Sequence, residues 1–161
     1  MKKRIANIIT AVSLCLTLLP MMAWAAETTH TVTSQEEFEA ALRDASAGDT
    51  ISISGSVTLY ESGQDALVID KAVTIQGDSH SSILVVRYSG IILGADVTFD
   101  NITLQFPSRS RNAIMANGHT LTLNNVARDP GGQQIHLFCG GMTGYTQENL
   151  PTQGLHGQII I

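Results

Sequence analysis

A five-residue unit recurs four times in this chain at nearly constant spacing. In each copy the first and third residues are apolar, the second is Ser or Thr, and the fifth is Gly or Asn. The copies begin 22, 24 and 24 residues apart and occupy residues 51–55, 73–77, 97–101 and 121–125. A fixed period of this size is typical of a stacked solenoid. Each copy is expected to be a short strand that ends at a corner, where Gly or Asn tolerates left-handed backbone.

Two further apolar series indicate three strands in each turn. One comprises residues 67–69, 91–93 and 115–116, at intervals of 24, and the other comprises residues 57–59, 83–86 and 102–104. Three short strands in a turn of about 24 residues suit a parallel β-helix, and the lack of a strict six-residue period favours the right-handed form. We therefore predict an all-β fold, a right-handed parallel β-helix solenoid with regular coils over residues 50–126.

Stacked turns would place equivalent side chains in columns, because strands of neighbouring turns lie about 4.8 Å apart and pair in register. The expected inward columns are Ile51, Val73, Val97, Leu121 and Ile53, Ile75, Phe99, Leu123. The expected outward row is Ser52, Thr74, Thr98 and Thr122. At one corner Asn101 is expected above Asn125, where two amides can form a ladder.

A short helix is expected before the first coil, over residues 34–47. Ser34 and Glu37 fit a capping box, in which each side chain satisfies a free backbone amide. Apolar residues at Phe38, Ala41, Leu42 and Ala45 form one stripe, and Gly48 fits the C-terminal capping position. Such a stripe can cover the open end of a stack, so we interpret the helix as an N-terminal cap.

The first 26 residues have the pattern of a secretory signal. A basic start is followed by an apolar run of about 15 residues, a proline, and small residues at Ala23, Ala25 and Ala26. Its removal would leave six basic against fourteen acidic residues, a net charge of −8. We expect a secreted or cell-surface protein that binds neither nucleic acid nor, after cleavage, a membrane. Only Cys139 would remain, so no internal disulfide is expected.

The C-terminal part departs from the repeat. Residues 127–157 are rich in Gly, Pro, Thr and Gln and are expected to form one long loop within the single domain 27–161. Residues 158–161 resemble the start of a further strand, and an apolar strand at this place offers an edge for pairing. We expect a solenoid truncated at the C-terminus, whose edge meets further coils or a second copy.

The sequence resembles a known superfamily in the segment Ala47-Gly48-Asp49-Thr50-Ile51, which follows the amphipathic helix and precedes strands of the Val-Thr-Ile type. This segment is similar to the N-terminal cap and first coils of the right-handed parallel β-helix superfamily that includes pectate and pectin lyases. The resemblance covers residues 32–126. More loosely, residues 134–141 are similar to Gly-Gly turns of bacterial β-helical surface proteins. The superfamily holds lyases, hydrolases and adhesins, so the resemblance implies a fold but no single activity.

Lyases of that superfamily use an Arg or Lys base beside carboxylates that bind calcium, and no such motif is matched here. Carboxylates at Asp65, Asp70, Asp78, Asp96 and Asp100 are candidates by residue type only. The histidines lack ligand-like spacing. We predict no catalytic residue, no metal site and no cofactor. Arg109 and Arg111, with Tyr88, are the predicted ligand-binding residues, because paired guanidinium groups can bind an acidic sugar.

Three functions remain open. We favour an exported, non-enzymatic bacterial cell-surface or adhesin-like β-helix segment that contacts carbohydrate or other surface molecules through its loops. The first alternative is the N-terminal fragment of a polysaccharide lyase or glycoside hydrolase with this fold. The second is a structural spacer that only carries another domain outward.

Overall fold

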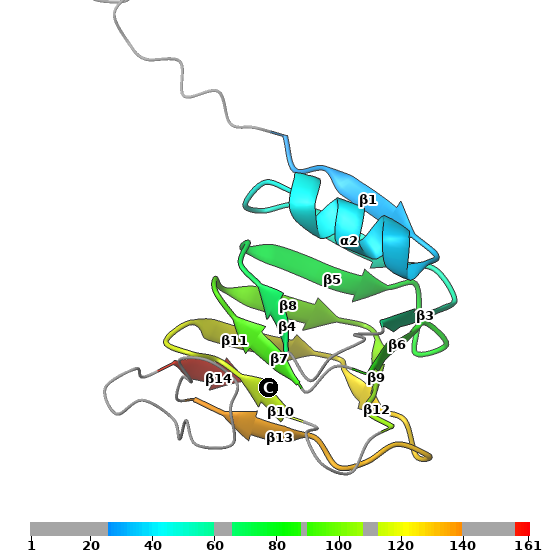
Figure 1. The fold of residues 1–161 in the computed structure, drawn as a ribbon, viewed down its shortest axis with the longest axis vertical. Coiled ribbons are helices and arrows are strands. Elements are labelled where there is room, and N and C mark those ends of the chain that lie inside the picture. Colours follow the sequence, from blue (N-terminus) through cyan, green and yellow to red (C-terminus); the bar gives the residue numbers. More distant parts are fainter. Residues whose placement is uncertain (1–25, 60–65, 88–89, 108–112, 140–156) are drawn as a thin grey trace, which may run out of the picture.

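The chain folds as a stack of short parallel strands wound around one apolar core, as a computed structural model shows (Figure 1). The structure describes residues 26–59, 66–87, 90–107, 113–139 and 157–161. Almost all of the expected signal segment, residues 1–26, therefore lies outside the described residues. Within the described ranges, no helix has both the length and the apolar character needed to cross a membrane.

Three parallel sheets form the walls of about four turns. The first sheet, in spatial order, is β1 (Thr29–Val32), β2 (Thr50–Ile53), β5 (Val73–Gly77), β8 (Val97–Asp100), β11 (Thr120–Asn124) and β14 (Gln158–Ile160). The second is β3 (Ser56–Leu59), β6 (Ile83–Val86), β9 (Thr103–Gln105) and β12 (Ala127–Arg128). The third is β4 (Leu67–Ile69), β7 (Ile91–Leu93), β10 (Ala113–Met115) and β13 (His136–Phe138).

The predicted all-β parallel solenoid with one short N-terminal helix is confirmed. Each strand has two to five residues, too few to bury an apolar face or satisfy its backbone alone. Pairing with the equivalent strand of the next turn supplies both needs, and every strand pair is parallel.

The first turn is displaced by two residues from the predicted register. Ile51 pairs with Ile75, where we expected Val73, and Ile53 pairs with Gly77. Later pairs of this sheet follow the prediction, with Val97 between Val73 and Leu121. Side chains of a strand alternate between faces, so a shift of two leaves the same residues inward.

The first two turns also differ in the length of the link that follows this sheet. Residues 78–82 join β5 to β6, whereas Ser54 and Gly55 alone join β2 to β3. Gly55, Asn101 and Asn125 occupy corners with φ of 78°, 49° and 51°. Gly77 instead ends β5 as a buried residue, and a Cβ there would lie 2.7 Å from the Asn101 carbonyl oxygen. The fifth residue of the unit is thus a left-handed corner in three copies but not in the second.

The third sheet differs from the prediction by one residue. Met115 pairs with Ile92, where the 24-residue interval placed it beside Ile91. Ile114 therefore pairs with Ile91 and is fully buried in the core. The outward residues of this sheet form an apolar column of Val68, Ile92, Met115 and Phe138.

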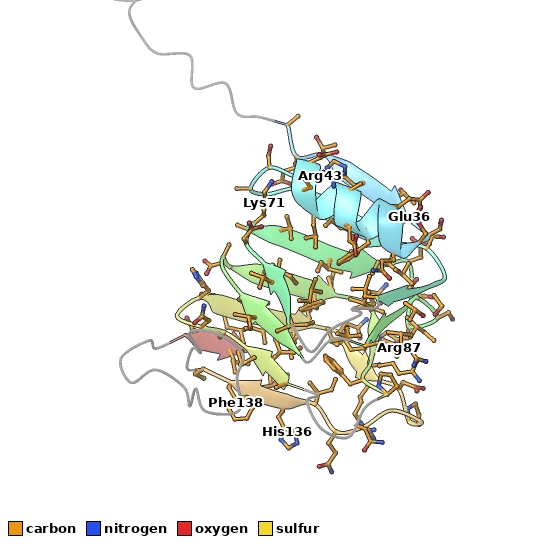
Figure 2. All side chains as sticks on the ribbon, in the orientation of Figure 1. Glu36, Arg43, Lys71, Arg87, His136 and Phe138 are labelled. Atoms are coloured by element: carbon orange, nitrogen blue, oxygen red, sulfur yellow. The ribbon has the colours of Figure 1, made fainter. Side chains whose placement is uncertain are left out.

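The helix α2 (Gln35–Asp44) closes the N-terminal end of the stack. The Ser34 hydroxyl accepts from the Glu37 amide at 3.2 Å, as the capping box predicted, while Glu37 Oε2 accepts from the Thr33 amide at 2.7 Å. The helix ends at Asp44, with Ala45 as its C-cap, instead of at Ala47, and Gly48 lies beyond it with φ of 96°. Lys71 lies beside this end and donates to the Ala45 carbonyl at 3.0 Å (Figure 2).

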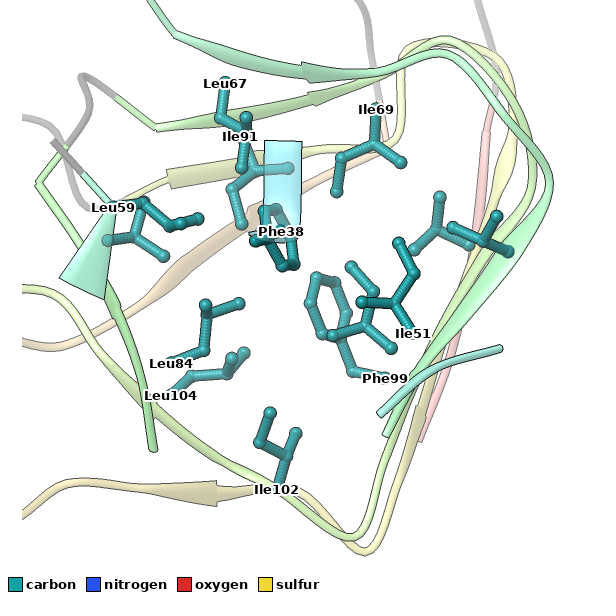
Figure 3. Packing of buried hydrophobic residues seen from close by; sticks show 14 of the residues in the cluster. Phe38, Ile51, Leu59, Leu67, Ile69, Leu84, Ile91, Phe99, Ile102 and Leu104 are labelled. Carbon is teal, nitrogen blue, oxygen red and sulfur yellow. The ribbon is translucent and has the colours of Figure 1, made fainter. Parts of the chain in front are cut away.

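The core runs along the axis between the three sheets. Its largest fully buried side chains include Phe38 from the helix and Phe99 from β8. Figure 3 shows Ile51 and Phe99 entering from one wall, Leu84 and Leu104 from a second, and Ile69 and Ile91 from the third. Phe38 covers this column at the N-terminal end, which places the predicted apolar stripe of the helix against the core.

In its described part, residues 127–139 and 157, the segment expected to be one long loop continues the solenoid. Residues 127–157 contain β12 and β13, which pair with β9 and β10. The expectation missed them because Gly131, Gly132 and Pro130 interrupt the apolar pattern between them. β14 then pairs with β11, as expected for the strand that begins at residue 158.

Candidate functional site

The three residues predicted to bind a ligand are Tyr88, Arg109 and Arg111. They fall in residues 88–89 and 108–112, outside the described residues. Their role in binding therefore stays a prediction.

The outer face of the first sheet presents two adjacent columns of short polar side chains, which we call the polar face. One column is Thr29, Thr50, Thr74, Thr98 and Thr122. The other is Thr31, Ser52, Gln76, Asp100 and Asn124. All ten side chains are half-buried or exposed, and Asp100 carries the only formal charge. The face thus offers a regular array of hydrogen-bonding groups at the spacing of the strands, about 4.8 Å.

Asp100 is the centre of a hydrogen-bonded ladder on this face. Its two carboxylate oxygens accept from the side-chain amides of Asn124, at 2.6 Å, and Gln76, at 3.3 Å. Both contacts hold the charge of Asp100 in place along the solenoid axis. The threonine column beside the ladder is left with rotatable hydroxyl groups, each able to donate and accept.

The other candidate carboxylates are dispersed. Asp96 accepts from the Thr120 amide at 2.7 Å, while Asp70 and Asp78 are exposed at other corners. In the part of the chain that the structure describes, no three His, Cys, Asp or Glu side chains converge as metal ligands would. Asp65 lies in residues 60–65, outside that part.

Sequence comparison agrees with this architecture. The family model described as "Putative pectate lyase-like adhesive domain" matches residues 29–136, well over half of the chain. The chain belongs to this family. The resemblance to the pectate lyase superfamily inferred from the capping helix and first coils is therefore confirmed. No curated protein and no solved structure matches the chain.

Two carboxylates among the described residues of this adhesive-domain chain have lowered pKa values, and both stabilise the N-terminal cap. Hydrogen bonds from the Ser46 and Thr28 amides, each 2.8 Å, lower the pKa of Asp49, and His30 adds a smaller effect. Bonds from the amide and hydroxyl of Thr33 lower the pKa of Glu37. These hydrogen bonds favour the charged form of each carboxylate and make the carboxylate a weaker base, so neither is suited to accept a proton.

Sequence reasoning found part of the polar face of this adhesive domain. It predicted Thr74, Thr98 and Thr122 in one row but placed Ser52 there instead of Thr50. It missed the ladder of Gln76, Asp100 and Asn124, although their spacing of 24 residues was a usable signal. At least seven side-chain hydrogen bonds join residues 24 apart, so this spacing marks contacts between turns.

Proposed function

We propose that this chain is a non-enzymatic adhesive module of an exported bacterial protein, which binds neutral glycans on its polar face. The observation that carries the proposal is the in-register threonine column beside a hydrogen-bonded amide ladder. The constant spacing of the threonine hydroxyls suits a ligand built of repeating sugar units, each of which carries hydroxyl groups. The family description, which includes the word adhesive, supports the same reading and favours a surface or extracellular location.

Charge favours neutral over acidic glycans. The chain has a formal net charge of −5, and the polar face contains Asp100 but no Lys or Arg. An acidic polysaccharide would meet like charge on this face without a cation to offset it. Binding a neutral glycan has a small desolvation cost, because its hydroxyl groups exchange hydrogen bonds with water for hydrogen bonds with threonine.

The test is binding of the purified chain to immobilised neutral β-glucan, chitin oligosaccharides and polygalacturonate. We expect binding to a neutral glycan, weakened about tenfold or more by Thr98→Glu, which adds a charge beside Asp100. Thr58→Glu is the matched control, because Thr58 also points outward but lies on β3 of the second sheet. Equal loss in both variants, or no binding to any neutral glycan, would contradict the proposal.

The loop residues provide a second comparison. Arg109→Ala combined with Arg111→Ala tests the ligand-binding role predicted from the sequence. If this double variant loses binding while Thr98→Glu keeps it, the loops bind the ligand and the polar face does not. Release of new reducing or unsaturated ends from polygalacturonate, with and without calcium, would overturn the non-enzymatic part and favour the lyase alternative.

A further inference from the structure

Three asparagines in the described part of the chain occupy corners of the solenoid with left-handed backbone. Asn101, Asn117 and Asn125 have φ of 49°, 51° and 51°. Each donates its side-chain amide to an acceptor 24 residues earlier in the sequence. Asn117 Nδ2 donates to the Leu93 carbonyl oxygen at 3.0 Å, as Asn101 does to Gly77 and Asn125 does to Asn101. The three residues therefore share one backbone conformation and one kind of contact between turns.

One of these asparagines is followed by glycine, and the pair forms the tight turn between β10 and β11. Asn117-Gly118 is the only Asn-Gly pair in the sequence. Both residues have positive φ, 51° and 88°, and the His119 amide donates to the Ala116 carbonyl at 2.8 Å, which is the pattern of a type I′ turn. Gly118 is exposed, and its amide has no hydrogen-bond acceptor among the described residues. The turn thus places an unhindered backbone nitrogen directly after a side-chain carboxamide.

A backbone nitrogen in this position can react with the side chain before it. The Gly118 nitrogen loses its proton to hydroxide and attacks Cγ of Asn117, and the new C–N bond closes an imide ring. The bond from Cγ to the side-chain nitrogen breaks, and that nitrogen leaves as ammonia. Water then opens the ring at either carbonyl and leaves an aspartate or an isoaspartate at position 117. Glycine favours the attack because it has no side chain beside the nitrogen and leaves the backbone free to rotate.

The other two corner asparagines are followed by β-branched residues. Ile102 comes after Asn101, and Val126 comes after Asn125. Their branched side chains crowd the backbone nitrogen and restrict the rotation that the attack requires. The following residue therefore distinguishes Asn117 from two asparagines of the same φ.

We propose that Asn117 is a site of spontaneous modification, at which the folded chain converts a side-chain amide to an acid. The hydrogen bond to Leu93 restrains the side chain, so the reaction is slower in the folded chain than in the unfolded one. It needs only water and hydroxide as co-reactants. The inference holds whatever ligand the polar face binds.

The modification removes a contact between turns. A carboxylate accepts hydrogen bonds but cannot donate one, so its oxygen would face the Leu93 carbonyl oxygen with no proton between them. An isoaspartate also carries the main chain through Cβ, which adds one atom to the two-residue turn. Both products therefore weaken the corner that leads into β11, the strand that contributes Thr122 and Asn124 to the polar face.

The test is incubation of the purified, folded chain at mildly alkaline pH, followed by trypsin digestion and mass spectrometry. Cleavage after Arg111 and Arg128 gives one peptide that contains both Asn117 and Asn125, so fragmentation of this peptide compares the two residues directly. We expect aspartate and isoaspartate to form several-fold faster at position 117 than at position 125. An Asn117 that stays intact in the folded chain, or that reacts no faster than Asn125, would overturn the proposal.

Two variants change the residue that follows each asparagine. Gly118→Asn keeps a residue that tolerates positive φ but adds a side chain beside the nitrogen, so Asn117 should react several-fold more slowly. Val126→Gly removes the branched side chain after Asn125 and should raise the rate at Asn125 several-fold. Circular dichroism checks that both variants fold. If Gly118→Asn leaves the rate at Asn117 unchanged, the following residue does not set the reactivity and the proposal is wrong.

A third variant, Asn117→Asp, reproduces the acidic product and tests its effect on the fold. Its midpoint of urea unfolding should be lower than that of the parent chain, and the β11 amides should exchange hydrogen faster. An unchanged midpoint with unchanged exchange would show that the modification leaves the corner intact, which contradicts the proposed effect.

Discussion

Asn125 donates its side-chain amide to Oδ1 of Asn101 at 2.8 Å, one full turn away, and both residues have left-handed backbone with φ near 50°. Asn101 in turn donates to the Gly77 carbonyl at 3.2 Å. The predicted amide ladder therefore exists, and its hydrogen bonds link three successive turns of the solenoid. The same residue type satisfies two requirements here, a strained backbone and a contact between turns.

Substitutions at Asn101 separate these two requirements. Asn101→Gly keeps a residue that accepts positive φ but removes the ladder hydrogen bonds. We expect it to lower the free energy of unfolding by about 1 kcal/mol. Asn101→Ala loses the ladder and also strains the backbone, so the loss should be larger by about 1 kcal/mol. Urea unfolding, followed by circular dichroism, measures the loss of stability in each variant. Equal stability of the two variants would show that the corner is not strained.

Gly77 is expected to be intolerant of a side chain for reasons of space. A Cβ at this position would lie 2.7 Å from the Asn101 carbonyl oxygen and 2.8 Å from Ser82 Cβ, so Gly77→Ala should cost about 1–3 kcal/mol. Gly55→Ala is the control, because Gly55 has φ of 78° but a Cβ added there would meet nothing within 4 Å. That change should cost only the backbone term, about 1–2 kcal/mol.

The difference in mechanism between these glycines can be measured. Asn tolerates left-handed backbone, so Gly55→Asn should recover most of the stability that Gly55→Ala loses. Gly77→Asn should be no better than Gly77→Ala, because its Cβ meets the same atoms. Recovery by Asn at residue 77 would contradict the steric explanation.

The stack of coils was predictable from the sequence, but the register of its first turn was not. Matching apolar residues two apart places Ile51 equally well beside Val73 or Ile75, since both choices bury the same face. Hydrophobicity alone therefore does not choose between the two registers. The correct register was indicated by an identical dipeptide that recurs 24 residues apart, as Thr50-Ile51 and Thr74-Ile75.

The candidate site was less accessible to prediction for a related reason. Most of the threonine column followed from the repeat, but the ladder through Asp100 joins three different residue types, so a search for identical residues does not find it. The ladder is found when residues 24 positions apart in the sequence are compared whatever their type. Tyr88, Arg109 and Arg111 were chosen by residue type, and they lie outside the described residues.

Phe99 should be the most sensitive position of the core. It is fully buried, and it lies between Ile75 and Leu123 of the neighbouring turns. Phe99→Ala removes a ring that no neighbour can replace, and we expect a loss of about 3–5 kcal/mol. The neighbouring residue Thr98 points outward, so Thr98→Ala should change the free energy of unfolding by no more than about 0.5 kcal/mol. Thermal and urea unfolding of both variants checks the contrast.

Asp49 should make the stability of the N-terminal cap depend on pH. The residue is 5% exposed, and its carboxylate joins β1 to the turn after α2 through the Thr28 and Ser46 amides, which lower its pKa. A group with a lowered folded-state pKa stabilises the fold above its unfolded pKa, about 3.9 for Asp. That stabilisation is lost as the pH falls through the lower folded-state value.

Asp49→Asn tests this dependence with a side chain of nearly the same shape. The variant should unfold at lower temperature than the parent at pH 7, and the difference should shrink as the pH falls below 4, because the parent then loses its charge. Asp70→Asn, at an exposed corner, is the matched control and should leave the unfolding temperature at pH 7 nearly unchanged. A constant difference between Asp49→Asn and the parent from pH 7 to pH 2 would show that shape, and not charge, gives Asp49 its role. Hydrogen exchange of the β1 amides, faster in the variant than in the parent at pH 7, would locate the loss at the cap.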